Sequence, residues 1–275
     1  MNLKMFFGGK KENKSKKADL INDMEHATLS DTMDKAGWVS PVYSQARDVR
    51  LDPNIMAMNR CVTMFPASPE IESYKVLRTR ILRRTKEQGG RSIMITSALP
   101  GEGKTITAIN LALTFAKGFE QTAMLVDCDF RKQCIHEVMG FNSDRGLLDH
   151  LLDGMPVSDL IVWPGIEKLT VISGGKTIQE SSEVIASPRM RELTSEMKDR
   201  YPERYVIFDV PPLLVGADAL AFAPLVDWIV LVVQAGKTSM AEVNKALQML
   251  PREKVLGLIL NRQTLQVESY PYQYQ

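Results

Sequence analysis

The chain has 275 residues, with 34 Lys and Arg against 33 Asp and Glu, so its formal net charge is only +1. Its 44% hydrophobic and 24% charged residues argue against wholesale disorder, a collagen-like repeat and a disulfide scaffold, and near-neutrality argues against nucleic acid as a partner. The longest apolar runs, residues 219–226 and 228–233, are separated by Asp227 and are too short to cross a bilayer. With three cysteines and no C-x-x-C pair, the composition predicts a cytoplasmic globular protein.

The first 67 residues differ in composition from the rest of the chain. Residues 1–17 carry Phe6 and Phe7, followed by five lysines and a single Glu12. Two interpretations stay open for this segment: a solvated tail, or contact with an anionic membrane surface, where each lysine contributes on the order of 1 kcal/mol. Residues 18–66 are interrupted by glycine and proline and are interpreted as a linker. We therefore expect a partly disordered, basic N-terminal extension over residues 1–67.

Ordered structure is expected from Ser68, because Ser68 and Pro69 form a good N-cap pair and apolar residues then recur at helical spacing up to Gly89. Beyond it, short apolar runs alternate with helical patterns. The predicted strands cover residues 92–96, 122–127, 168–172, 204–209, 228–233 and 255–260, and the predicted helices cover residues 104–115, 147–152, 188–197 and 239–250. This alternation predicts an α/β domain over residues 68–262, with a mostly parallel sheet and helices on both faces.

A phosphate-binding loop follows the first of these strands. Residues 97–105 read Ser-Ala-Leu-Pro-Gly-Glu-Gly-Lys-Thr and lie between a predicted strand and a predicted helix, as this motif requires. Its glycines let backbone N–H groups close around a polyphosphate, Lys104 can reach the β and γ phosphates, and Thr105 can bind Mg²⁺. The expected phosphate and nucleotide contacts are Pro100, Gly101, Glu102, Gly103, Lys104, Thr105 and Ile106.

Acidic residues end two further strands. Asp127 and Asp129 follow residues 122–126, and Asp209 follows residues 204–208. The carboxyl ends of parallel strands line the ligand crevice, so these carboxylates are expected to lie beside the phosphate-binding loop and to hold Mg²⁺ or orient a nucleophile. The last strand ends at Asn261 and Arg262, where a contact with a nucleotide base and simple capping of the strand are both open.

In these motifs the chain resembles the bacterial tyrosine kinases that control capsule and exopolysaccharide synthesis. The resemblance runs from Ser68 to the C-terminus and rests on residues 100–105, on the D-x-D-x-R of residues 127–131, on Asp209 with its two following prolines, and on residues 187–193. It implies a P-loop NTPase fold, ATP and Mg²⁺ as cofactors, and tyrosine autophosphorylation. The related MinD and ParA ATPases carry a signature lysine where this chain has Leu99.

The resemblance also implies roles for single residues. Lys104 would hold phosphates, and Thr105, Asp129 and Asp209 would position Mg²⁺. Asp127 would accept the tyrosine proton or orient its oxygen, with Asp129 left open as the alternative proton acceptor. In the C-terminal tail, residues 263–275, the expected phosphorylation sites are Tyr270, Tyr272 and Tyr274, unless this aromatic tail packs on its own domain. The helix after Ser68 carries Glu72, Lys75 and Arg78 at the positions of an E-x-x-R-x-x-R subunit contact, with Lys75 in place of an arginine.

The expected partners are a second copy of the chain in a ring and a separate transmembrane activator of polysaccharide chain length. Together with these partners, the kinase is expected in the cytoplasm, peripheral to the inner face of the plasma membrane. Two other functions stay open from the residues alone: a MinD-like ATPase switch, and a catalytically weak ATP-binding adaptor of a polysaccharide complex.

Overall fold

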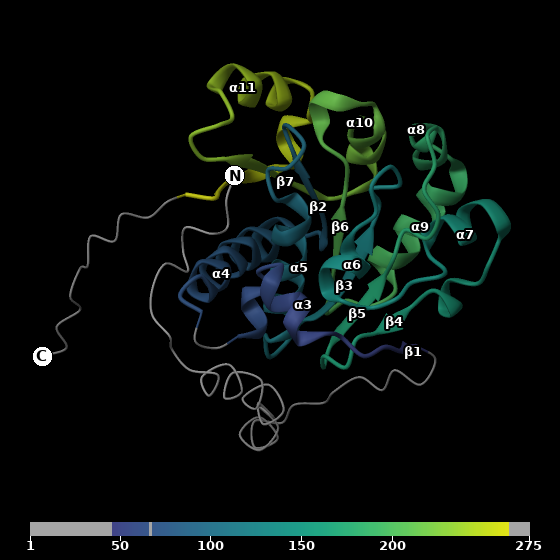
Figure 1. The fold of residues 1–275 in the computed structure, drawn as a ribbon. Coiled ribbons are helices and arrows are strands. Elements are labelled where there is room, and N and C mark those ends of the chain that lie inside the picture. Colours follow the sequence, from purple (N-terminus) through teal and green to yellow (C-terminus); the bar gives the residue numbers. More distant parts are fainter. Residues whose placement is uncertain (1–45, 66–67, 264–275) are drawn as a thin grey trace, which may run out of the picture.

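The computed structural model describes residues 46–65 and 68–263 (Figure 1). The expected N-terminal lysine segment and the tyrosines Tyr270, Tyr272 and Tyr274 lie outside the described residues. The membrane contact, the disorder of the extension and the phosphorylated tail therefore stay predictions.

A single eight-stranded sheet forms the centre of the domain, in the order β1-β4-β5-β3-β6-β2-β7-β8. Every neighbouring pair is parallel except β4 and β5. The strands are β1 (Arg47–Asp48), β2 (Ser92–Ser97), β3 (Thr122–Asp127), β4 (Val162–Trp163), β5 (Leu169–Ile172), β6 (Arg204–Asp209), β7 (Trp228–Gln234) and β8 (Val255–Asn261). The expected strands are confirmed to within a residue at each end, and the two-residue strands β1 and β4 were missed because neither shows a periodic pattern.

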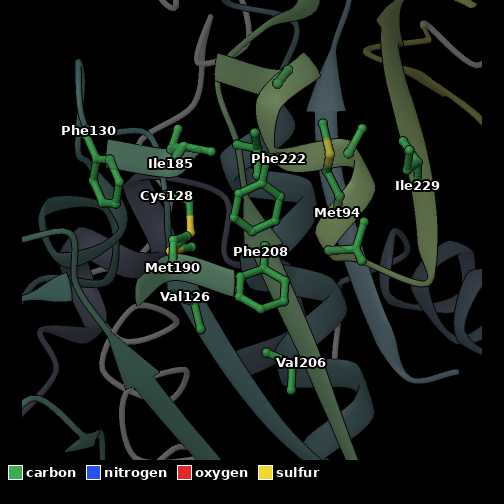
Figure 2. Packing of buried hydrophobic residues seen from close by; sticks show 14 of the residues in the cluster. Met94, Val126, Cys128, Phe130, Ile185, Met190, Val206, Phe208, Phe222 and Ile229 are labelled. Carbon is green, nitrogen blue, oxygen red and sulfur yellow. The ribbon is translucent and has the colours of Figure 1, made fainter. Parts of the chain in front are cut away.

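Helices cover both faces of this sheet, as expected (Figure 1). They are α3 (Pro53–Met58), α4 (Ile71–Gln88), α5 (Lys104–Ala116), α6 (Ile135–Met139), α7 (Leu147–Asp153), α8 (Ser181–Ile185), α9 (Pro188–Asp199), α10 (Asp218–Phe222) and α11 (Met240–Gln248). Side chains alternate between the faces: Ile95 of β2 packs in one core with Phe115 of α5, and Met94 packs in the other with Phe222 of α10 (Figure 2). Two-sided burial explains why the central strands are continuous apolar runs.

The expected boundary of the folded domain at Ser68 is wrong. Residues 46–65 belong to the domain: Met56 and Cys61 are fully buried, and the backbone N–H of Thr63 donates to Asn110 of α5 at 3.0 Å. Pro53 was interpreted as a breaker, but it is the first residue of α3, where proline costs no hydrogen bond, and Asp52 caps that helix. The part of the linker that the structure describes is thus folded.

The start of α4 also differs from the expected one. The helix begins at Ile71, and the Ser68 hydroxyl donates to the Glu70 carboxylate at 2.5 Å instead of capping the helix. By contrast, Ser187 and Ser239 cap the N-termini of α9 and α11, and Gly89, which has a φ of 79°, is the C-cap of α4. None of the helices in the described part of the chain combines the length and apolar character needed to span a bilayer.

Candidate active site

The phosphate-binding loop joins the carboxyl end of β2 to the N-terminus of α5. Gly101 and Gly103 have φ values of 80° and 94°, a backbone conformation that favours glycine. A Cβ atom on Gly103 would also lie 2.1 Å from the Asn261 amide nitrogen. The backbone N–H groups of residues 101–105 donate to no other group within the described ranges, so they are free to bind an anion at the start of the helix.

The Glu102 side chain stabilises this loop through hydrogen bonds. Its carboxylate accepts the Leu99 N–H at 2.7 Å and the Thr238 hydroxyl, and the residue is only 2% exposed. The Glu102 carbonyl accepts the Asn261 amide at 2.8 Å, while the Asn261 side-chain oxygen accepts the Arg262 N–H. Of the two interpretations of Asn261, the geometry therefore fits the capping of the strand end. The Glu102 carboxylate is thus bonded within the chain, and the nucleotide contact expected of Glu102 stays a prediction.

The acidic side chains meet Lys104 where β3 and β6 end side by side. Asp127 lies opposite Asp209 in the strand register. The Lys104 Nζ lies 2.8 Å from Asp129 Oδ2, 3.2 Å from each oxygen of Asp209 and 3.3 Å from the Thr105 hydroxyl, which itself donates to Asp209 at 2.6 Å. The structure thus brings together Lys104, Thr105, Asp129 and Asp209.

This cluster holds more negative than positive charge in a dry environment. Burial, together with the charge of Asp209, raises the pKa of Asp127 to about 7, and burial also raises the pKa of Asp209. Burial alone would lower the pKa of Lys104, but Asp209 and Asp129 outweigh it and hold that pKa above its usual value. A further cation beside these carboxylates would relieve the imbalance.

Asp127 makes its hydrogen bonds with the backbone that follows β3. It is fully buried and accepts the N–H groups of Asp129, Cys134 and Ile135 at 3.1 to 3.2 Å. These bonds shape the loop that carries Asp129. The proton-accepting role expected for Asp127 stays a prediction.

The donor set around Lys104 suits Mg²⁺. Hydroxyl and carboxylate oxygens are the ligands that Mg²⁺ prefers, and it is usually held by one or two carboxylates together with substrate phosphates and water. In residues 46–65 and 68–263 no group of three or more acidic, histidine or cysteine side chains is arranged to hold a metal alone. The Lys104 ammonium stands among the same oxygens that would bind the ion, so the residues fit Mg²⁺ that arrives with a nucleotide.

The expected subunit-contact residues lie along α4, apart from this cluster. Lys75 pairs with Glu72 at 2.6 Å on the exposed side of the helix. Arg78 is half-buried, and its Nη1 donates to the Thr114 carbonyl of α5 at 2.7 Å. Arg78 therefore ties α4 to α5 in the single chain, and the ring contact stays a prediction.

A groove of about 430 Å³ leads from the first turn of α5 to the outer edge of β8. Ile106, Asn261 and Arg262 line its end next to the phosphate-binding loop, and Tyr74 and Leu77 of α4 line it further along. Arg262 has a φ of 57° and is exposed. Two of the expected nucleotide contacts, Ile106 and Arg262, thus share one surface.

Sequence reasoning missed several residues that shape the site. Thr238, in the loop after β7, donates to Glu102, Cys134 places its thiol 3.6 Å from the Thr105 hydroxyl, and Asp218 pairs with Arg131 at 3.1 Å. Each contact joins positions that are distant in the chain and follow no local motif, so no signal in the sequence could have found them.

A parallel sheet, a glycine-rich loop at the start of α5 and a lysine among strand-end carboxylates define a P-loop nucleotide-binding protein. Residues 90–256 match the AAA domain family. Tyrosine-protein kinase YwqD of Bacillus subtilis is 34% identical over 225 residues, which cover 81% of this chain and 92% of the relative. The chain therefore belongs to the bacterial tyrosine kinase family, as the motifs predicted.

Two further similarities point the same way. The kinase domain of Escherichia coli tyrosine kinase ETK has a TM-score of 0.69 at 25% identity, over 88% of this chain and 97% of that one. Succinoglycan biosynthesis transport protein ExoP of Rhizobium meliloti is 33% identical over 216 residues, which cover 74% of this chain and 26% of ExoP. The match covers most of YwqD and of the ETK kinase domain, so the MinD-like alternative is not favoured.

Proposed function

We propose that this chain transfers the γ-phosphoryl group of ATP to Tyr270, Tyr272 and Tyr274 in its own C-terminal tail. The observation that carries the proposal is the position of the Lys104 ammonium, within 3.3 Å of Thr105, Asp129 and Asp209 at the start of the phosphate-binding loop. The Lys104 ammonium and the oxygen atoms that would bind Mg²⁺ are thus placed where the phosphates of ATP would bind.

In this proposal the loop amides of residues 101–105 and Lys104 hold the phosphates. Thr105, Asp129 and Asp209 hold Mg²⁺, which neutralises charge on the phosphate oxygens when it is bound. The nucleoside extends toward Ile106 and Arg262, where the groove beside the loop offers apolar and cationic contacts. The chain's contribution to the rate is positioning and electrostatic stabilisation.

Asp127 is the proposed acceptor of the tyrosine proton. Its raised pKa, about 7, is close to a physiological pH, which suits a group that must take up and release a proton. Three backbone N–H groups hold its carboxylate in place. Asp129 is the alternative acceptor, because it is nearer to Lys104.

We further propose that phosphorylation occurs between subunits. Tyr272 lies eleven residues after Asn261, and at about 3.3 Å per residue this stretch spans at most roughly 36 Å, which is enough to reach a neighbouring nucleotide. Glu72, Lys75 and Arg78 would contribute to the contact between copies in a ring.

The proposed physiological role is regulation of exopolysaccharide or capsule synthesis. ExoP, named as a biosynthesis transport protein, supports this setting. We infer a separate transmembrane regulator of chain length as the activator, with the kinase at the inner face of the plasma membrane, where the N-terminal lysines would meet anionic lipid.

The test uses the full chain with labelled ATP and Mg²⁺, with and without candidate membrane partners. Replacing Tyr270, Tyr272 and Tyr274 together by Phe is expected to remove the phosphotyrosine signal. The matched control is Tyr201→Phe, since Tyr201 is also exposed but lies outside the tail, and it should leave the signal intact. An intact chain that gains no phosphotyrosine in any mixture contradicts the kinase proposal, whereas label that persists on the triple variant contradicts only the tail assignment.

A further inference from the structure

Arg131, the arginine of the D-x-D-x-R motif, makes its side-chain contacts away from Lys104. Its Nε donates to the Ser181 hydroxyl at 3.0 Å, and its Nη2 lies 3.1 Å from Asp218 Oδ2. The Ser181 hydroxyl donates to the other oxygen of Asp218. These three side chains, called the Arg131 junction below, join the loop after β3 to the first residues of α8 and α10.

The carboxylate at the centre of this junction is buried. Asp218 is 1% exposed and Ser181 is fully buried, whereas the Arg131 side chain is 41% exposed. Within the described ranges Arg131 is the only cation that pairs with Asp218. A buried carboxylate costs several kcal/mol unless it is paired, so the guanidinium of Arg131 is the group that compensates the charge of Asp218.

The residue between the motif's second aspartate and its arginine is anchored as well. The Phe130 ring is fully buried in the same core as Ile185 of α8 and Phe222 of α10 (Figure 2). Its carbonyl accepts the Ile178 N–H at 3.0 Å. Phe130 and Arg131 therefore fix one side of the loop, while Asp129, next to them in the chain, reaches Lys104 on the other side.

The junction also reaches the other carboxylate of the site. Asp218 lies on the segment that leaves β6 after Asp209, and Asp209 shares the Lys104 ammonium with Asp129. Arg131 and Asp218 therefore join the two segments that present these carboxylates.

We propose that Asp218 is a positioning residue for the divalent cation, which acts through Arg131 to hold Asp129 at the distance from Asp209 that the ion requires. The inference rests on the proposed function, because it takes Asp129 and Asp209 as ligands of the ion. It adds a residue that touches neither nucleotide nor metal. Partners of this kind, behind the metal ligands, typically change metal affinity by about 10- to 100-fold when they are removed.

The experiment measures Mn²⁺ affinity of the full chain by electron paramagnetic resonance, with saturating ADP present. Asp218→Asn is expected to weaken Mn²⁺ binding by about tenfold, while ADP affinity measured without metal stays close to that of the parent. Asp227→Asn is the matched control, because Asp227 also pairs with a cation, Lys198, but lies at the start of β2. This variant should leave Mn²⁺ affinity unchanged.

A double-mutant comparison separates positioning from general loss of stability. If Asp218 acts through Arg131, then Arg131→Gln, Asp218→Asn and the double variant should weaken Mn²⁺ binding to the same extent. Unchanged Mn²⁺ affinity in Asp218→Asn, or additive losses in the double variant, would overturn the inference.

Two further outcomes are informative. If Asp218→Asn does not fold, Ser181→Ala removes one hydroxyl from the junction and should weaken Mn²⁺ binding in the same direction; no change would again overturn the inference. A parent chain that binds neither ADP nor Mn²⁺ contradicts the proposed function and, with it, this inference. A parent that binds both, beside an unaffected Asp218→Asn, contradicts this inference alone.

Discussion

The two ends of the central strands each carry a buried or half-buried aspartate, in opposite electrostatic situations. Near the start of β2, Asp227 accepts the N–H groups of Arg91 and Ser92 and the Ser92 hydroxyl, and it pairs with Lys198 at 2.5 Å. Burial alone would raise the pKa of Asp227, but its bonds to Lys198 and Ser92 outweigh burial and hold that pKa below its usual value. The hydrogen bonds and the neutralising charge of this carboxylate thus come from the chain itself.

At the opposite end of the sheet, the carboxylates outnumber their cation. Asp127, Asp129 and Asp209 surround the single ammonium of Lys104, and burial raises the pKa of both Asp127 and Asp209. A charge that a fold needs only for stability is neutralised by the fold, as at Asp227. An excess that the fold leaves in place is where we propose that an outside cation binds.

The largest expected effect follows from this contrast and concerns Asp209. Asp209→Asn removes the proposed Mg²⁺ ligand and should lower phosphotyrosine formation by about 100-fold or more. The same change relieves repulsion among buried carboxylates, so the midpoint of thermal unfolding should stay equal or rise. The assays are phosphotransfer with labelled ATP and thermal unfolding by circular dichroism.

Asp227→Asn is the mirror image of that variant. It loses the ion pair to Lys198 and should lower the free energy of unfolding by about 1 to 3 kcal/mol, while phosphotyrosine formation stays near the parent level. The contrast between the two ends breaks down if Asp209→Asn is the less stable variant, or if Asp227→Asn is the inactive one.

A smaller effect is expected when the ammonium is removed. Lys104 occupies the oxygens that would bind the ion, so the chain without nucleotide should bind Mn²⁺ poorly. Lys104→Met removes that internal cation and should raise the nucleotide-free Mn²⁺ affinity by about tenfold or more, because the carboxylates lose their only neutralising partner among the residues described. Electron paramagnetic resonance without nucleotide measures it, and equal affinities in both chains would show that Lys104 does not compete with the ion.

Much of the fold was predictable, and the reason is visible in β3 and β6. Both are continuous apolar runs that end in an aspartate, and because parallel strands end at the same edge, Asp127 and Asp209 had to meet there. The chemistry of the site follows from local sequence for the same reason.

Other features could not be predicted from the sequence, because contacts between residues far apart in the chain determine them. Helix α3 packs beside α6, where its C-cap Asn59 donates to the Val138 carbonyl, and the Arg131 junction depends on Asp218 and Ser181, which no motif links to the arginine. Asn261 is open between two roles from the sequence, and its bond to the Glu102 carbonyl, which favours the strand-end role, also joins residues far apart in the chain.

A last expected effect is a dependence of stability on pH that the two ends of the sheet produce with opposite signs. Asp127 binds its proton up to a pH of about 7 in the folded chain, whereas an unfolded aspartate loses it near its usual pKa of about 4. Between these values the folded state holds more protons than the unfolded state, so raising the pH through this window should lower the free energy of unfolding. Asp227 acts in the opposite direction, because its lowered pKa gives stability that is lost as the pH falls below the usual value. Chemical denaturation from pH 4 to 8 should show that the free energy of unfolding of the parent falls toward pH 7, whereas that of Asp127→Asn does not. If Asp127→Asn keeps the full pH dependence, the titration belongs to another group.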